Sequence, residues 1–107
     1  MQRYFLEIKF KNDNLRELYE QGKSKKYKLQ KDIVKRFIMR INQLEAANDI
    51  YDLWQNKSLN FEKLEGNKNL YSIRVNEQYR IELEIEWLDE NKTKGIINIV
   101  ELSNHYK

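Results

Sequence analysis

The sequence predicts an α+β fold in which an N-terminal strand and two helices pack on one face of a mostly antiparallel sheet. Three patterns predict it. Apolar residues alternate near the N-terminus, recur every three or four residues through a long basic stretch, and alternate again from Phe61 onward. With 107 residues, of which 40% are apolar, the chain can bury one core, so we expect a single domain over residues 1–107.

The first half predicts a strand and two helices. Residues 4–10 alternate in polarity, as in a strand with one apolar face. Asn12 or Asp13 can cap a short helix that ends near Gly22. A second helix is expected from about Lys25 to Ala47, because one stripe carries apolar side chains at helical spacing: Leu29, Ile33, Phe37, Ile41 and Leu44.

The second half predicts a meander of strands. Residues 48–57 mix polar and apolar side chains and are expected to form an irregular connector or a single helical turn. Strands are then predicted over 70–76, 79–87 and 95–102, with a turn over 89–91.

The register of the 70–87 hairpin can be predicted because cross-strand partners must share a face of the sheet. Only a three-residue loop of Asn76, Glu77 and Gln78 keeps the faces matched, and it pairs Arg74 with Arg80. This register sets two guanidinium groups side by side on the face without helices. Two like charges repel each other, so the arrangement becomes favourable when an anion lies between them. Alternatively, a neighbouring carboxylate such as Glu82 bridges them.

Positive charge is concentrated in the first part of the chain. Residues 1–42 hold 12 Lys/Arg and 5 Asp/Glu, a net +7, whereas residues 43–107 carry a net −4. Such a basic run is either the footprint of a polyanion partner or a solvated helix face. The candidate cations are Lys28, Lys31, Lys35 and Arg36.

Composition excludes several classes of site. The chain has no Cys and a single His, so disulfides, thiolate zinc sites, cysteine nucleophiles and histidine-rich metal sites are excluded. Glu82, Glu84 and Glu86 share a strand face, but alternate acidic residues are typical of a wet strand, and we expect neither a metal nor a cofactor. No apolar run resembles a signal peptide or membrane span, so we expect a cytoplasmic protein without membrane contact.

The C-terminal tail offers proton-transfer groups. His105 and Tyr106 follow the last predicted strand and are either exposed tail residues or are carried onto the face that holds the arginines. An imidazole beside phosphate-binding arginines suits RNA cleavage by the 2′-hydroxyl, which needs a base, an acid and cations but no metal.

Three segments together resemble the HigB branch of the RelE-like toxins of bacterial type II toxin–antitoxin systems. They are FEKLEG at 61–66, YSIRVNEQYRI at 71–81 and ELSNHY at 101–106. The resemblance implies a RelE-like compact domain and a ribosome-dependent, metal-independent endoribonuclease that cleaves mRNA in the A site. It also implies a HigA-like helix-turn-helix antitoxin, through which alone the toxin reaches operator DNA.

Site residues follow from the resemblance by position. Arg74 and Arg80 correspond to phosphate-binding arginines, His105 and Tyr106 to the catalytic tail, and Glu101 to the acidic residue near the end. Many relatives read L-K-G where this chain has Glu65 as the middle residue. The missing cation would then come from Lys63 or Lys68. A non-catalytic RNA- or protein-binding module on the same fold is the alternative.

Overall fold

The computed structural model of the protein describes residues 6–66 and 69–104. Its strands are β1 (Leu6–Phe10), β2 (Glu62–Lys63), β3 (Leu70–Arg74), β4 (Tyr79–Trp87) and β5 (Gly95–Asn104). Its helices are α1 (Asp13–Gln21), α2 (Lys31–Ala46), α3 (Ile50–Gln55) and the 3-10 turn η1 (Lys57–Leu59). The five strands form one sheet in the order β1-β5-β4-β3-β2, in which only β1 and β5 pair in parallel. The predicted α+β fold is therefore confirmed.

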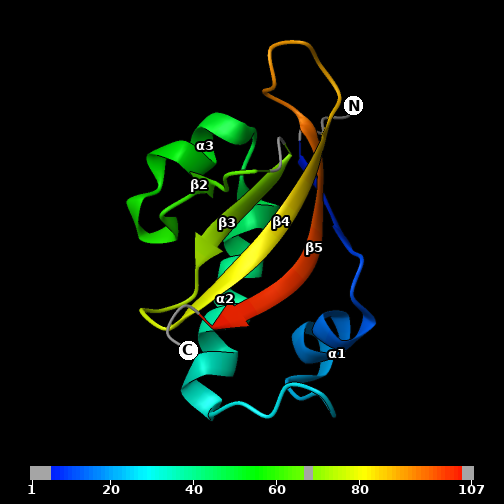
Figure 1. Cartoon of the computed structure of the whole chain (residues 1–107), viewed down its shortest axis with the longest axis vertical. Coiled ribbons are helices and arrows are strands. Elements are labelled where there is room, and N and C mark those ends of the chain that lie inside the picture. The colour runs from blue at the N-terminus through cyan, green and yellow to red at the C-terminus, as the bar shows by residue number, and fades with distance from the viewer. Residues whose placement is uncertain (1–5, 67–68, 105–107) are drawn as a thin grey trace.

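The core lies between α2 and the sheet, and Figure 1 shows α2 behind the strands. Phe37 and Ile41 of α2 are fully buried, as are Ile81 and Leu83 of β4 and Ile97 of β5. Each such side chain contributes about 1.5–3 kcal/mol by leaving water. The opposite face of β4 and β5 carries polar residues. Among the described residues, no helix is long and apolar enough to cross a membrane.

Helix α1 forms as predicted. The Asn12 side chain accepts hydrogen bonds from the backbone N–H groups of Asn14 and Leu15, which satisfies two donors at the helix start. Gly22 ends the helix in the left-handed conformation with φ of 77°, and its N–H donates to the carbonyl of Leu18. The apolar side of α1 buries Leu15 and Leu18 against the core.

Helix α2 begins at Lys31, six residues later than the apolar spacing predicts. Ser24 Oγ accepts hydrogen bonds from the backbone N–H groups of Lys26 and Tyr27, a local turn that does not continue into a helix. The Tyr27 hydroxyl then donates to Glu101 on β5, a contact that ties this segment to the sheet. The prediction of a helix from Lys25 was wrong because these tertiary contacts outweigh local propensity, and Lys28 precedes α2.

The connector and the strand ends differ slightly from the predicted ranges. Asp49 caps α3 by accepting from the N–H groups of Tyr51 and Asp52, so the connector contains a six-residue helix followed by η1. Strand β3 stops at Arg74, two residues early, and β5 continues two residues further to Asn104.

A β-bulge in β5 decides which side chains reach the polar face. Leu83 pairs with Ile99, but Glu82 pairs with Glu101, so Val100 is an extra residue without a partner. The bulge shifts the alternation by one residue, which keeps Leu102 in the core and brings Ser103 opposite Arg80. The Asn12 side-chain amide donates to the carbonyl of Val100 over 3.3 Å and so ties the bulge to the cap of α1.

Candidate functional site

The β3–β4 hairpin has the predicted three-residue loop and register. Arg74 pairs with Arg80, and the Val75 N–H donates to the carbonyl of Tyr79 over 2.9 Å. The Asn76 side chain fixes the loop because its oxygen accepts from the N–H groups of Gln78 and Tyr79 at 2.9 and 2.8 Å. The loop thus holds the two arginine backbones at a defined separation.

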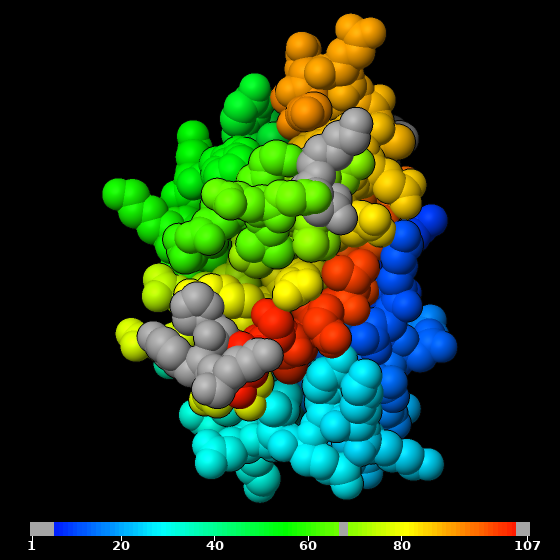
Figure 2. Space-filling view, in the orientation of Figure 1, coloured from blue at the N-terminus to red at the C-terminus, as the bar shows by residue number. Residues whose placement is uncertain are grey.

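Arg80 lies in an open hollow on the polar face of the sheet, which we call the Arg80 hollow. Its volume is about 430 Å³, and its other lining residues are Glu62, Leu64, Ser72, Glu82, Ser103 and Asn104. The Arg80 guanidinium donates through Nη1 to the carbonyl of Asn76 over 2.9 Å, which holds it beside the loop. Figure 2 shows this face, with the exposed ends of β4 in yellow and of β5 in red.

Arg74 does not line the Arg80 hollow. It lines a second hollow, on the side of the hairpin next to α2, together with Arg36 and Arg40. The backbones of Arg74 and Arg80 are therefore paired across the two strands, but their side chains line different hollows. Within the described ranges, neither Arg74 nor Arg80 forms an ion pair. A bridge between them through Glu82 is therefore absent from this part of the chain.

Glu101 does not line the Arg80 hollow. Its Oε1 accepts a hydrogen bond of 2.6 Å from the Tyr27 hydroxyl and one of 3.0 Å from the Leu102 N–H. Burial, and then the hydrogen bond to Glu101, raise the pKa of Tyr27 to about 12. The Asn12 amide also donates to the Tyr27 hydroxyl over 3.2 Å. Glu101 therefore anchors the segment before α2 to β5.

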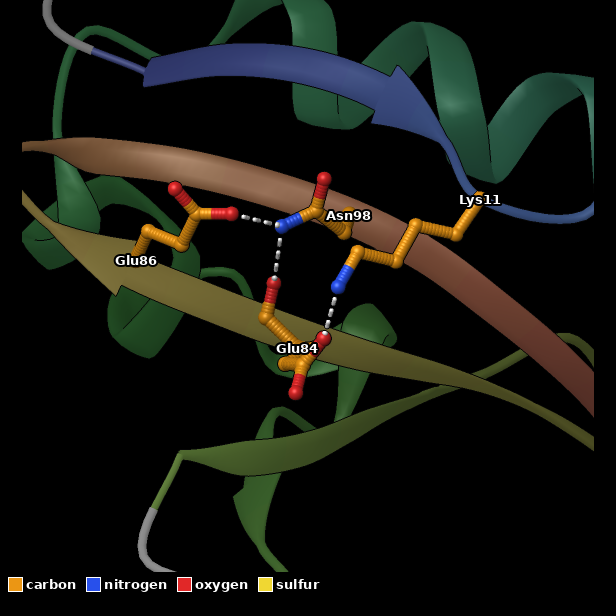
Figure 3. A network of polar contacts seen from close by, with 4 residues as sticks. All are labelled: Lys11, Glu84, Glu86 and Asn98. Atoms are coloured by element: carbon orange, nitrogen blue, oxygen red, sulfur yellow. Dashed lines mark hydrogen bonds and ion pairs between the residues drawn. The ribbon is translucent and has the colours of Figure 1, made fainter.

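The remaining carboxylates of β4 are engaged in a separate polar network (Figure 3). Lys11 Nζ lies 2.6 Å from Glu84 Oε1, and this hydrogen bond raises the pKa of Lys11. Asn98, which is only 3% exposed, donates to Glu86 Oε2 over 3.0 Å and to the Glu84 carbonyl over 3.3 Å. These contacts give the alternating acidic residues a role in joining β4 to β5 and to the end of β1.

The predicted cations are spread over several surfaces. The Lys63 ammonium lies 5.5 Å from the centre of the Tyr71 ring, a cation–π contact on β2. Lys31 and Lys35 are exposed on α2, and Lys28 lines a third hollow between α1 and α2. None of these four lysines is among the residues that line the Arg80 hollow. Three predicted site residues lie outside the described ranges: Lys68, His105 and Tyr106.

Two residues with a part in the site were missed by the sequence reasoning. Arg40 is buried, although its spacing of seven from Ile33 and four from Leu44 already set it on the apolar stripe of α2. Tyr27 carried no comparable signal, because its bond to Glu101 joins residues far apart in sequence.

Comparison with known proteins supplies the family. The model of the HigB-like toxin family, described as RelE-like toxin of type II toxin–antitoxin system HigB, matches residues 8–99. Among curated proteins, a sequence search finds no match to the chain. The family match includes the hairpin with Arg74 and Arg80, the helices α1, α2 and α3, and the first half of β5. The chain therefore belongs to the HigB-like toxins, a RelE-like family of type II toxin–antitoxin systems.

Proposed function

We propose that this toxin is a ribosome-dependent endoribonuclease that cleaves mRNA in the A site and so inhibits translation. The observation that carries the proposal is the Arg80 hollow, where Arg80 lies beside Ser103 and Asn104 at the end of β5. In sequence, His105 and Tyr106 follow Asn104 directly. The chain therefore carries two proton-transfer groups in the residues directly after the strand end that lines this hollow with Arg80.

The proposed reaction is an internal transfer at phosphorus. The 2′-oxygen of the ribose attacks the adjacent phosphorus and loses its proton to a base, while the bond to the 5′-oxygen breaks and that oxygen gains a proton from an acid. Arg80 stabilises the added negative charge on the phosphoryl oxygens. We assign the proton transfers to His105 and Tyr106, and we assign Glu101 to positioning β5, because its carboxylate accepts from Tyr27. This route requires no metal or cofactor.

The partners follow from the family and from the charge distribution. A type II toxin has an antitoxin, and we propose a HigA-like helix-turn-helix protein that also provides the contact with operator DNA. We propose that ribosomal RNA is contacted by five basic residues: Lys28, Lys31, Lys35, Lys63 and Lys68. Because its target would be the translating ribosome, we propose that the toxin acts in the cytoplasm.

Substitution of Arg80 tests the assignment. Arg80→Lys keeps the positive charge but loses the planar fork, and we expect a loss of mRNA cleavage on ribosomes of about a hundredfold, typical for removal of one transition-state donor. The matched control is Lys9→Gln, a charge change on the exposed side of the opposite edge strand. Full cleavage by a folded Arg80→Lys protein would remove Arg80 from the mechanism.

The alternative of a non-catalytic binding module has one observation in its favour. Glu62 and Glu82 line the same hollow as Arg80 and oppose the approach of a phosphate. A binding module predicts that the wild-type protein co-sediments with ribosomes but leaves bound mRNA intact, whereas the nuclease proposal requires both binding and cleavage.

A further inference from the structure

Three arginines line the hollow next to α2. We call these three residues, together with the hollow that they line, the arginine cluster. Arg36 and Arg40 come from α2, and Arg74 comes from the end of β3. The hollow has a volume of about 450 Å³ and is open to solvent. The rest of its wall is formed by Asp32, Ser58, Asn76 and Glu77.

Arg40 forms the buried part of the arginine cluster. It is 6% exposed, and its hydrogen-bond acceptors are all neutral: Gln43 Oε1 at 3.1 Å, Ser58 Oγ at 3.3 Å and the Val75 carbonyl at 3.5 Å. Within the described part of the chain, its Nε has no hydrogen-bond partner. A buried guanidinium without a carboxylate is costly, because water solvates it better than neutral oxygens do.

The neighbouring charges add to this cost. Burial lowers the pKa of Arg40 below its ordinary value, and the positive charges of Arg36 and Arg74 lower it further. Asp32 and Glu77 line the hollow, but neither forms an ion pair in the ranges that the structure describes. Asp32 and Glu77 reduce the net charge of the hollow, but the three arginines still outnumber them, and none of the three is joined to a carboxylate in an ion pair within the described ranges.

A purely structural role explains only part of this arrangement. Arg40 does connect α2 to η1 and to the end of β3 through Ser58 and Val75. A side-chain amide can donate to two neutral oxygens without the cost of burying a charge, so these contacts alone do not call for a guanidinium. Such a role also gives no reason for Arg36 and Arg74 to stand beside it. A bound anion does, because it turns three mutually repelling cations into favourable contacts.

We propose that Arg36, Arg40 and Arg74 bind a phosphate of an RNA backbone, at a position separate from the Arg80 hollow. The proposal deepens the proposed function, since RNA is the substrate there. The β3–β4 hairpin lies between the two sites, because Asn76 lines the arginine cluster while its carbonyl holds Arg80. One strand of RNA that crosses the hairpin meets both, so Arg74 grips a phosphate that is not the one cleaved.

The test is a binding titration with an RNA that cannot react. A short 2′-O-methyl oligoribonucleotide lacks the nucleophilic hydroxyl, so binding is measured whether or not the protein is a nuclease. In the isotope-labelled protein, the arginine Nε–Hε signals of Arg36, Arg40 and Arg74 should shift together and saturate. Arg74→Gln should weaken binding about tenfold, whereas Lys9→Gln on the opposite edge strand should change it less than twofold.

Arg40→Lys tests the buried member, and it keeps the charge while losing the guanidinium fork. We again expect binding about tenfold weaker, with an unchanged melting temperature as the check on folding. If this variant does not fold, Arg36→Gln, which alters an exposed side chain, takes its place. Equal affinities in the cluster variants and in Lys9→Gln would overturn the proposal.

Three further outcomes are distinct from one another. Signals that move with a glutamate-rich peptide of equal charge, and not with RNA, would overturn the proposal and assign the cluster to a protein partner. Cleavage of ribosome-bound mRNA at wild-type rates by Arg74→Gln, together with unaltered RNA binding, would overturn the phosphate site and leave the proposed nuclease intact. Binding at the cluster without any cleavage would support the phosphate site and reject the nuclease.

Discussion

At the scale of single residues, the contact between Tyr27 and Glu101 links the two halves of the chain. The Tyr27 hydroxyl donates to a carboxylate on β5, and Asn12 donates to that hydroxyl while it caps α1. One small cluster therefore fixes the start of α2, the end of β5 and the bulge that brings Ser103 opposite Arg80. Its effect on the candidate site is indirect and acts through the position of β5.

The raised pKa of Tyr27 predicts how stability changes with pH. The value is about 12 in the folded protein and about 10 in an unfolded chain. The contribution is fully present below pH ~10 and is lost as the pH rises toward 12, because only the unfolded state then loses its proton. Tyr27→Phe should therefore cost about 1 kcal/mol at pH 8, and this difference should shrink or reverse by pH ~11.5.

Urea unfolding at pH 8, 10 and 11.5 measures this difference in the free energy of unfolding. Tyr51→Phe is the matched control, because Tyr51 is 55% exposed. It should leave the pH dependence unchanged. A constant gap between the wild type and Tyr27→Phe across the whole pH range would show that the hydroxyl does not remain protonated beside Glu101.

At the scale of elements, the hairpin was predictable and the bulge was not. The Arg74–Arg80 register follows from matching apolar faces within one stretch of sequence, and the structure confirms it. The Val100 bulge is contacted by Asn12, which lies 88 residues away and donates to its carbonyl. Likewise, α2 starts late because Tyr27 bonds to a distant carboxylate. Local patterns predict elements, whereas their ends depend on contacts across the fold.

The same limit applies to the candidate site. Cross-strand pairing placed the two arginines side by side, but the hollows that their side chains line depend on α2 and β5. No pattern within the hairpin could show that Arg74 lies with Arg36 and Arg40. The direction of the Glu101 carboxylate was equally hidden, since Tyr27 determines it.

The start of β5 provides a test of close packing between strands. Gly95 pairs with Trp87, and a Cβ at this position would lie 2.7 Å from the carbonyl oxygen of Glu86 and 3.1 Å from Ile85 Cγ2. Because a backbone oxygen has little room to move, Gly95→Ala should lower the free energy of unfolding by about 1–3 kcal/mol. Chemical denaturation measures the change.

Gly22→Asn serves as the control for Gly95→Ala. Gly22 has open space around its Cα and a left-handed backbone that asparagine tolerates, so its stability should stay within about 0.5 kcal/mol of the wild type. If Gly95→Ala were as stable as this control, the strands would have to separate at Gly95 without cost, which contradicts the packing described above.

At the scale of the whole molecule, charge and topology divide the surface. The positive charge of residues 1–42 lies on and before α2, whereas the polar face of β4 carries alternating carboxylates. The β3–β4 hairpin stands between these regions and presents Arg80 to one side and Arg74 to the other. A toxin of this family that reads RNA would therefore approach it through the hairpin and the α2 side.

The most direct test of the central proposal compares ribosome-bound and free mRNA. The purified, folded toxin, free of antitoxin, is added to translating ribosomes on a defined mRNA, and to the same RNA alone with EDTA. Primer extension then maps the new 5′ ends. We predict cuts at A-site codons in the ribosome-bound sample and an intact free RNA. An uncut mRNA on the ribosome would contradict the nuclease proposal and favour a binding module on the same fold.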